Sequence, residues 1–208
     1  MTGAAYNAVK RSVDVVVAAA GLAVSSPVLA AVALLIRRNV GSPVLFRQQR
    51  PGKDERIFEL VKFRTMHDPD PTSGLLSDAA RLTQLGRFLR STSLDELPTL
   101  WNVLRGDMSL VGPRPLLVKY LDRYTPDQRR RHAVRPGVTG LAQVSGRNAL
   151  TWDEKFALDL EYVETFGLAL DTRIIFATLG SVVGRNGISD GKSATMSEFR
   201  GPKAEPHA

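Results

Sequence analysis

Residues 90–115 have the sequence RSTSLDELPTLWNVLRGDMSLVGPRP. Asp95 and Glu96 are adjacent, and apolar residues follow them at the i, i+3, i+4 and i+7 spacing of one helical face. Gly106 follows as the expected C-cap. The stretch therefore predicts a short helix with two carboxylates at its start. The face that we expect to be buried consists of Leu97, Leu100, Trp101 and Leu104.

Two starts of this helix are compatible with the sequence. Ser93 can be the N-cap with Glu96 three residues later, which is a capping box. Alternatively Asp95 is the N-cap, and Pro98 then lies in the first turn, where proline is tolerated best. In both cases the two acids lie at the positive end of a helix, which favours ionised carboxylates and is also where a phosphate can bind.

Charged and rigid residues surround the two acids. Arg90 lies one short turn upstream, Asp107 follows the helix, and the GPRP loop at residues 112–115 carries Arg114. Acids at a helix start are most often simple caps. Two acids together with two arginines and a stiff loop instead indicate a site for a metal-bound phosphate.

The composition indicates an anionic partner. The 208-residue chain, long enough for one domain, has a formal net charge of +7, and arginine supplies 21 of its 28 basic residues. The planar guanidinium suits bidentate contact with phosphate. Cysteine is absent, which excludes disulfides, thiolate zinc sites and a cysteine nucleophile. We do not expect nucleic acid as a partner, because the basic residues are not interleaved with aromatic residues that could stack on bases.

Residues 13–36 form an apolar run with a single charge, Asp14. As one straight helix the run would be about 36 Å long, enough to cross a bilayer. Ser26 and Pro27 near its middle are expected to break the helix, and basic residues flank both ends. Because positive residues favour the cytoplasmic side, we expect a re-entrant helix-break-helix hairpin at residues 10–38. A spanning helix, a signal peptide and a buried soluble helix are the alternatives.

The rest of the chain predicts short strands and amphipathic helices. Lys62 and Arg64 are two apart and should share one face of a strand, and Asp171 is a possible cap of the last helix. That helix lies either in the membrane interface or in the core. The basic run at residues 129–131 is expected at the surface. Strands are expected at residues 44–46 and 57–66, with a polar, basic turn at residues 47–52 between them. Helices are expected at 75–89, 116–122, 152–166 and from 171 onward.

A second loop region is rich in glycine. Residues 135–148 have the sequence RPGVTGLAQVSGRN, in which glycines let the backbone approach a ligand closely. Arg135 and Arg147 lie near its ends. Glycine, serine and proline dominate from about residue 187, and we expect residues 190–208 to be a loose tail.

Four segments follow one another along the chain: residues 10–27, KFRTM at 62–66, SLDELPTLWNVLRGDMSLVGPRP at 93–115, and RPGVTGLAQVSGRN with the WDEKF that follows it. Together they resemble the bacterial sugar transferase family, the monotopic polyprenyl-phosphate phosphoglycosyl transferases. The resemblance extends from about residue 7 to about residue 189, and the chain is similar to the minimal form that starts bacterial N-linked protein glycosylation. It implies an α/β (α+β), mostly helical fold in one domain, residues 1–189. The re-entrant hairpin would precede a cytoplasmic catalytic part at residues 39–189, with short strands and interfacial helices.

The resemblance also implies a reaction and a site. A sugar 1-phosphate would move from a UDP-sugar to a polyprenyl phosphate such as undecaprenyl phosphate, releasing UMP by a ping-pong route through a covalent phosphosugar-aspartate. Asp95 matches the nucleophile and Glu96 the second acid, both implied ligands of Mg²⁺. Ser26 and Pro27 match the membrane break. The expected setting is the bacterial inner membrane, at the first membrane step of glycoconjugate assembly and upstream of other glycosyltransferases. The candidate substrate-binding residues are Lys62, Arg90, Arg114, Arg135 and Arg147.

Two other functions fit parts of the sequence. A non-enzymatic basic scaffold on the membrane surface would explain the charge and the hairpin equally well, and would not need the two acids. A metal-dependent glycosyltransferase could use Asp68 and Asp70 of the D-x-D pattern at residues 68–70, although the neighbouring prolines favour an ordinary loop. Replacing Asp95 discriminates the phosphoglycosyl transferase from both.

Overall fold

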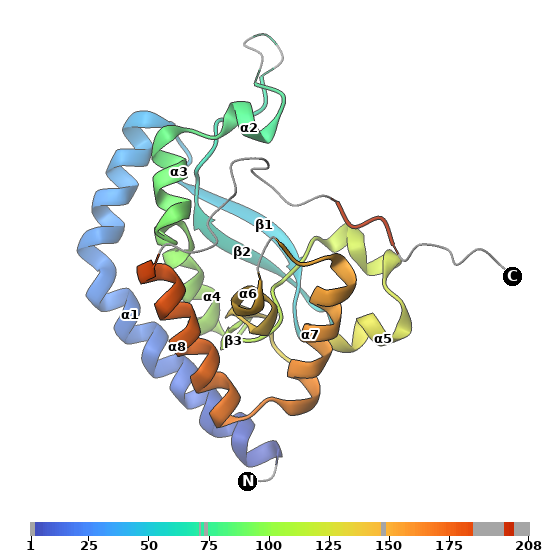
Figure 1. Cartoon of the computed structure of the whole chain (residues 1–208). Coiled ribbons are helices and arrows are strands. Elements are labelled where there is room, and N and C mark those ends of the chain that lie inside the picture. The colour runs from blue at the N-terminus through green and yellow to red at the C-terminus, as the bar shows by residue number, and fades with distance from the viewer. Residues whose placement is uncertain (1–2, 71, 73–74, 147–148, 185–197, 202–208) are drawn as a thin grey trace, which may run out of the picture.

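The fold, taken from a computed structural model, is mostly helical, with two small two-stranded sheets (Figure 1). The structure describes residues 3–70, 72, 75–146, 149–184 and 198–201. The long N-terminal helix α1 lies along one side, and Asp171 near the start of α8 contacts Tyr6 and Lys10 of α1. The elements are α1 Gly3–Asn39, β1 Leu45–Pro51, η1 Lys53–Glu55, β2 Ile57–Phe63, α2 Asp78–Arg81, α3 Gln84–Ser91, η2 Leu94–Thr99, α4 Leu100–Arg105, β3 Ser109–Val111, η3 Val118–Arg123, α5 Pro126–Arg129, η4 Arg130–Ala133, β4 Gly137–Thr139, α6 Leu141–Ser145, α7 Trp152–Thr165 and α8 Leu168–Gly184.

Helix α1 continues through Pro27, where we expected a break between two arms. Figure 1 shows that the helix changes direction along its length but remains one ribbon. Pro27 has no N–H for the carbonyl of Ala23, and the hydroxyl of Ser26 donates to that carbonyl instead, at 2.8 Å. The Ser25 hydroxyl likewise donates to Gly21 O at 2.6 Å. These side-chain bonds satisfy backbone groups at the proline, so the helix bends without ending.

The apolar part of α1 is long enough to cross a membrane by length and composition. Only 11% of its most apolar window is buried against the rest of the chain, unlike the core helix of a soluble protein. Its inner face packs on α4 and the first sheet through Ala18, Val32 and Ile36. The remainder exposes valines and leucines, Val24 at 82%.

Strands β1 and β2 form an antiparallel hairpin that pairs Leu45 with Phe63 and Pro51 with Ile57. Both predicted strands exist, but β1 extends through the segment that we expected to be a basic turn. Arg47 explains the difference, because it pairs with Glu59 on the opposite strand at 2.6 Å. Strand β2 ends at Phe63, and Arg64 turns away to bind Ser42 O and Met66 O.

The helix expected at residues 75–89 is divided into α2 and α3. The Thr83 hydroxyl accepts from Gly86 N at 2.8 Å and so caps a new helix. Helix α3 then crosses Thr65 so closely that a Cβ on Gly86 would lie 2.0 Å from Thr65 O. Glycine at this position therefore sets the contact between α3 and the end of β2.

The segment with the two acids begins as a 3-10 helix, η2, and becomes α-helical only at Leu100. Ser93 occupies the N-cap position of η2, as the first alternative predicted, but with φ 57° and no side-chain cap hydrogen bond, so the predicted capping box is absent. Asp95 lies inside η2 and is not its N-cap. The tighter winding of η2 shifts the phase of the apolar face, so Trp101, expected to be buried, is 50% exposed, and Asn102 and Val103 are buried instead. Gly106 ends α4 with φ 93°, as predicted.

Strands β3 and β4 are parallel and bring the two glycine-containing loops together. A Cβ on Gly112 would lie 2.4 Å from Arg135 O, and one on Gly137 would lie 2.1 Å from Gly112 N. These glycines therefore permit the close approach of one backbone to another. The GPRP loop leaves β3 at this junction and carries Arg114.

A cluster of aromatic side chains joins η3, α7 and residues 198–201. Phe199 lies in the segment that we expected to be a loose tail, but it is 2% exposed and packs among Tyr120, Tyr124 and Phe156. The expectation of looseness is therefore wrong for residues 198–201. Beneath these rings Arg131, from the run expected at the surface, donates twice to Asp159 of α7, at 3.0 and 2.6 Å.

Asp171 also differs from its predicted role as a helix cap. It lies inside α8 and is buried, and its carboxylate accepts from the hydroxyls of Tyr6 and Tyr162, both at 2.7 Å, and from Lys10. This polar cluster fastens the start of α1 to α7 and α8. A fully buried carboxylate requires such donors, which the local sequence does not reveal.

Candidate active site

Asp95 and Glu96 lie on η2, which packs against strand β2 and follows directly after α3. Asp95 is 5% exposed, and its neighbour Glu96 is half-buried. No side chain or N–H of the described residues donates a hydrogen bond to the Asp95 carboxylate. A buried carboxylate without donors costs free energy, which a bound cation or hydrogen-bond donor would offset.

The charge around Asp95 is balanced by three cations from separate elements. Burial and the neighbouring Glu96 carboxylate raise the pKa of Asp95. The positive charges of Lys62, Arg90 and Arg114 oppose that rise. The sequence predicted these same three cations as phosphate-binding residues, and the fold brings them around the acids.

Lys62 and Arg90 approach Asp95 from β2 and α3. Burial lowers the pKa of Lys62, and the Asp95 carboxylate opposes this. The Arg90 Nε donates to the Thr65 hydroxyl at 3.1 Å, which fixes the guanidinium beside the site. Thr65 was not among the predicted residues and positions Arg90 by this bond.

Arg114 comes from the GPRP loop and donates to Glu96 Oε1 at 2.5 Å. The Glu96 charge raises the pKa of Arg114. The carbonyl of Arg114 accepts a hydrogen bond from Arg131 at 2.7 Å. Arg131, which is also paired with the buried Asp159, therefore helps to hold the GPRP loop. Glu96 is therefore oriented by the loop.

Arg50 was missed by the sequence interpretation. It extends from β1, where its Nη1 donates to Pro115 O at 3.2 Å and its Nη2 to Gln48 at 2.6 Å. Burial and the nearby Arg114 lower the pKa of Arg50 to about 10. Two close guanidinium groups favour an anion between or beside them. Its place in a segment that resembled an exposed basic turn concealed this role.

Of the last two predicted substrate-binding residues, Arg135 is not among the cations that act on Asp95. Arg135 donates through Nε to Gly106 O at 2.9 Å and lines a different cavity. Arg147 lies outside the described residues. The D-x-D acids are likewise elsewhere: Asp68 pairs with Arg64 at 2.7 Å, and Asp70 accepts from Thr72 N at 2.9 Å, as in an ordinary loop.

The donor set at the two acids fits a magnesium ion in part. Within the described ranges, no group of three or more His, Asp or Glu side chains is arranged to hold a metal. Asp95 and Glu96 supply two carboxylates, and the oxygens of Asp95 are not occupied by hydrogen-bond donors from the described chain. Magnesium is commonly bound by one or two carboxylates together with substrate phosphates, so the dyad suits it once a diphosphate is bound.

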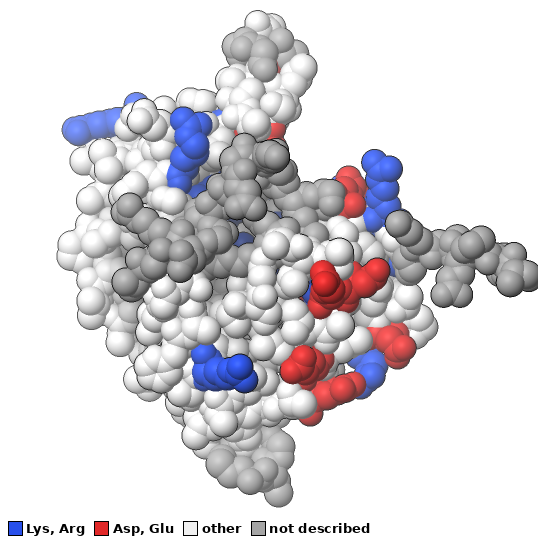
Figure 2. Space-filling model, viewed as in Figure 1, with Lys and Arg blue, Asp and Glu red and all other residues white. Residues whose placement is uncertain are grey.

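One side of the molecule is apolar. Figure 2 shows that charged side chains are sparse over α1, apart from basic residues near its upper end, and that acidic residues gather over α7. Helix α8 adds Phe176, 68% exposed, and Leu179, 56% exposed, beside α1. Exposed apolar surface of this extent typically marks a membrane or partner surface.

Comparison with known proteins gives a consistent set of relatives. A family model described as bacterial sugar transferase matches residues 5–185. The uncharacterized sugar transferase EpsL of Bacillus subtilis is 47% identical over 193 residues, covering 92% of this chain and 96% of EpsL. A UDP-glucose:undecaprenyl-phosphate glucose-1-phosphate transferase of Caulobacter vibrioides is 42% identical over 84% of this chain and 69% of its own length. The undecaprenyl-phosphate galactose phosphotransferase of Salmonella typhimurium is 38% identical over 86% of this chain but only 41% of its own length.

Proposed function

Because the chain belongs to the bacterial sugar transferase family, we propose that it transfers a sugar 1-phosphate from a UDP-sugar to a membrane polyprenyl phosphate and releases UMP. The names of the Caulobacter and Salmonella relatives differ in the sugar, and both include undecaprenyl phosphate. The observation that carries the proposal is a buried Asp95 without hydrogen-bond donors in the described chain, set beside Glu96 and among Lys62, Arg90 and Arg114.

The first step is attack by an Asp95 carboxylate oxygen on the sugar-bearing phosphorus. An oxygen–phosphorus bond forms, the bond from that phosphorus to the bridging oxygen breaks, and UMP leaves with the bridging oxygen and its electron pair. A phosphosugar remains on Asp95 as an acyl phosphate. A carboxylate whose pKa is raised and whose oxygens lack donors has no competing bonds to lose when it attacks.

In the second step an oxygen of the polyprenyl phosphate attacks the same phosphorus, and the Asp95 carboxylate departs. The product is polyprenyl-diphosphosugar, and the enzyme is regenerated, which gives ping-pong kinetics. Glu96 is placed to take the proton of an acceptor phosphate that arrives protonated. Arg114 holds Glu96 at 2.5 Å and keeps it in position for this role.

The cations supply most of the remaining catalysis, because phosphoryl transfer depends on positioning and charge neutralisation. Lys62, Arg90 and Arg114, whose charges act on Asp95, would bind the diphosphate, and Arg50 is close enough to Arg114 for their charges to interact. Asp95 and Glu96 would also hold Mg²⁺, which would neutralise charge on the donor diphosphate and on the UMP that leaves.

The membrane arrangement belongs to the same proposal. We infer that α1 dips into the cytoplasmic leaflet of the bacterial inner membrane and returns, with Ser26 and Pro27 at the turn and the catalytic part on the cytoplasmic side. Basic residues at both ends of the apolar run and the exposed apolar side chains of α1 and α8 support this placement. A soluble donor and a lipid acceptor could then meet at the interface, at the first membrane step of glycoconjugate assembly.

The test measures UMP release by the protein in nanodiscs with Mg²⁺, polyprenyl phosphate and a panel of UDP-glucose, UDP-galactose and UDP-N-acetylgalactosamine. We expect release by the wild type with at least one donor. The Asp95→Asn variant should lose about 10³-fold or more in rate. Asp127→Asn, which removes an exposed acid of α5, is the matched control and should retain activity.

A second measurement isolates the covalent step. Wild-type protein incubated with the donor and no acceptor should gain the mass of one phosphosugar on intact-mass spectrometry, and Asp95→Asn should not. Transfer that survives in Asp95→Asn would refute the nucleophile assignment. Lipid binding without transfer from any donor would favour the scaffold function.

A further inference from the structure

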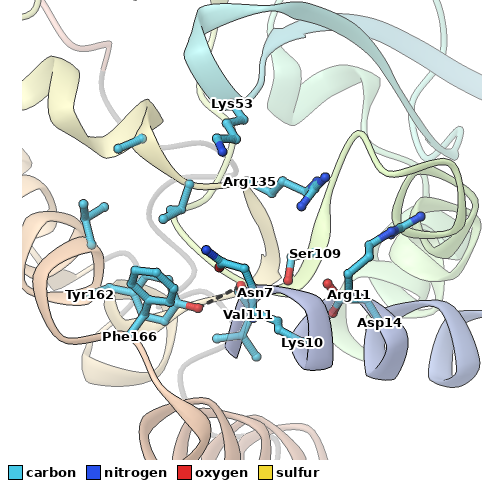
Figure 3. Close-up of a pocket in the computed structure, with 13 residues that line it drawn as sticks. Asn7, Lys10, Arg11, Asp14, Lys53, Ser109, Val111, Arg135, Tyr162 and Phe166 are labelled. Atoms are coloured by element: carbon cyan, nitrogen blue, oxygen red, sulfur yellow. Dashed lines mark hydrogen bonds between the residues drawn. The ribbon is translucent and has the colours of Figure 1, made fainter. Parts of the chain in front are cut away.

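A second basic site lies away from the two acids, in a cavity of about 210 Å³ between the start of α1, η1, β3, the loop before β4, and α7. Figure 3 shows Lys53 and Arg135 on one side of this space and Asn7 and Lys10 on the other, with Ser109 between them. None of Lys62, Arg90, Asp95, Glu96 and Arg114 lines it. The cavity is therefore distinct from the site proposed for transfer.

Its lining carries more positive than negative charge. The cations are Lys10, Arg11, Lys53 and Arg135, and the lining carboxylate is Asp14. Lys10 is compensated by an ion pair with Asp171. Arg11, Lys53 and Arg135 form no ion pair with any acid of the described chain, which leaves three cations against one carboxylate.

The two arginines are held in place by backbone carbonyls, which orient them without neutralising them. Arg11 donates to Val103 O at 2.6 Å and to Leu104 O at 2.8 Å, and Arg135 donates to Gly106 O at 2.9 Å. Asp14 accepts from Leu110 N at 2.9 Å. Fixed guanidinium groups with spare N–H donors are suited to an oxyanion, because little side-chain entropy is lost on binding.

Ser109 supplies an independent indication of a ligand. Its side chain is 1% exposed, lines the cavity, and its hydroxyl has no hydrogen-bond partner among the described residues. A buried hydroxyl without a partner costs free energy that an occupant of the cavity would recover. The opposite wall is apolar and contains Val163 and Phe166.

We propose that this cavity binds the phosphate group of a small phosphate ester, with Lys53, Arg11 and Arg135 as the charged contacts and the Ser109 hydroxyl as a donor. The apolar wall would receive the carbon part of the ester. Because Lys10 and Arg11 stand at the charged start of the apolar helix, the phosphate can come from an anionic lipid headgroup or from a soluble ester, and the two sources share this chemistry.

The test uses the full-length wild type and three variants. Lys53→Gln removes an exposed cation of the cavity, and Ser109→Ala removes the buried hydroxyl. Lys119→Gln is the matched control, since Lys119 is half-exposed, lies outside the cavity and pairs with Glu198 at 2.7 Å, an acid that Arg123 also holds. The readout is binding, so the result does not depend on turnover at Asp95.

The soluble arm measures binding of sn-glycerol 3-phosphate to detergent-solubilised protein by calorimetry. The lipid arm measures by native mass spectrometry how much phosphatidylglycerol stays on protein released from nanodiscs that contain phosphatidylglycerol and phosphatidylcholine. We expect one arm to show binding that Lys53→Gln and Ser109→Ala each weaken about tenfold, while Lys119→Gln matches the wild type.

The arm that responds identifies the source of the phosphate. Weakened glycerol phosphate binding supports a soluble ester, and loss of retained phosphatidylglycerol supports a lipid headgroup. Equal binding by the wild type, Lys53→Gln and Ser109→Ala in both arms would overturn the proposal. Circular dichroism of each variant separates loss of binding from loss of folding.

Discussion

Two buried aspartates in different regions differ in the hydrogen bonds that their carboxylates accept, and this difference bears on which of them could react. Asp95 on η2 and Asp159 on α7 are 5% and 4% exposed, and burial raises the pKa of both. Asp159 accepts two hydrogen bonds from Arg131, whereas Asp95 accepts none from the described residues. The two carboxylates are therefore equally buried but differ in whether they accept hydrogen bonds.

Two further buried aspartates resemble Asp159. Asp14 accepts from Leu110 N, and Asp171 accepts from two tyrosines and Lys10. In each of these cases the hydrogen-bond donors offset the free-energy cost of burying the carboxylate, and they also link one element to another. At Asp95 the compensating charges lie nearby without bonding to the carboxylate, so its oxygens remain available to a substrate.

The largest effect is expected when the Arg131 side chain, which donates to Asp159, is removed. Arg131→Met should lower the free energy of unfolding by about 3–5 kcal/mol, because Asp159 is left buried without a partner. Thermal or denaturant unfolding in detergent measures it. Arg130→Met is the control, since Arg130 pairs with Glu164 at the surface and should cost about 0–1 kcal/mol. Equal losses in the two variants would contradict the structural role.

The next effect concerns the reactive carboxylate itself. Asp95→Glu keeps the charge but moves the attacking oxygen by one methylene, and we expect UMP release to fall about 10²-fold. Asp159→Glu should disturb stability more than the rate per folded molecule. Initial rates normalised to folded protein measure the contrast. A fully active Asp95→Glu variant would show that the position of this oxygen is not critical.

A smaller effect is expected when Arg114 becomes lysine. Lysine keeps the charge but loses the planar fork that holds Glu96 at 2.5 Å, so we expect a rate about tenfold lower. Arg47→Lys is the control because Arg47 forms a single exposed pair with Glu59 on the strands. The comparison of kcat for the two variants checks the prediction, and equal rates would argue against positioning by Arg114.

The smallest effect is a gain in stability. The folded state raises the pKa of Asp95, so it favours the protonated form, and ionisation at neutral pH opposes folding. Asp95→Asn should therefore raise the melting temperature at pH 7 by about 2–4 °C for each kcal/mol gained, and the gain should vanish as the pH falls below the usual carboxyl pKa of 3.8. Melting curves in EDTA across that range test this. If the gain in melting temperature instead grew toward low pH, the raised pKa of Asp95 would be contradicted.

Much of the site was predictable from short-range pattern. The adjacent acids, Arg90, Arg114 and the strand that carries Lys62 were identified from sequence, and the structure brings them together. Gly106 ends α4 as predicted, because a positive φ strongly favours glycine. The two acids, Arg90 and Arg114 lie close together in sequence, and Gly106 depends on one backbone angle. Lys62 is distant from them in sequence, and its place in the site was implied only by the family resemblance.

Other features could not be predicted from local pattern. Trp101 was expected inside and lies outside because a 3-10 start changed the phase of the helix. Arg50 and Arg135 are each followed by Pro-Gly in the sequence. Arg50 nevertheless lies near Arg114 and the two acids, whereas Arg135 lines a separate cavity. Asp171 resembled a cap until Tyr6 and Tyr162 approached it from far along the chain.

The sequence by itself determined the apolar helix, the family and the two acids, because hydrophobic run length, ordered motifs and residue chemistry are properties of the linear chain. Only the tertiary structure decided which buried aspartates received donors and which did not. The physical reason is that hydrogen-bond partners such as Arg131 for Asp159 lie 28 residues away, and pairing at that distance is set by the packing of whole elements. The freedom of the Asp95 oxygens is a result of that packing.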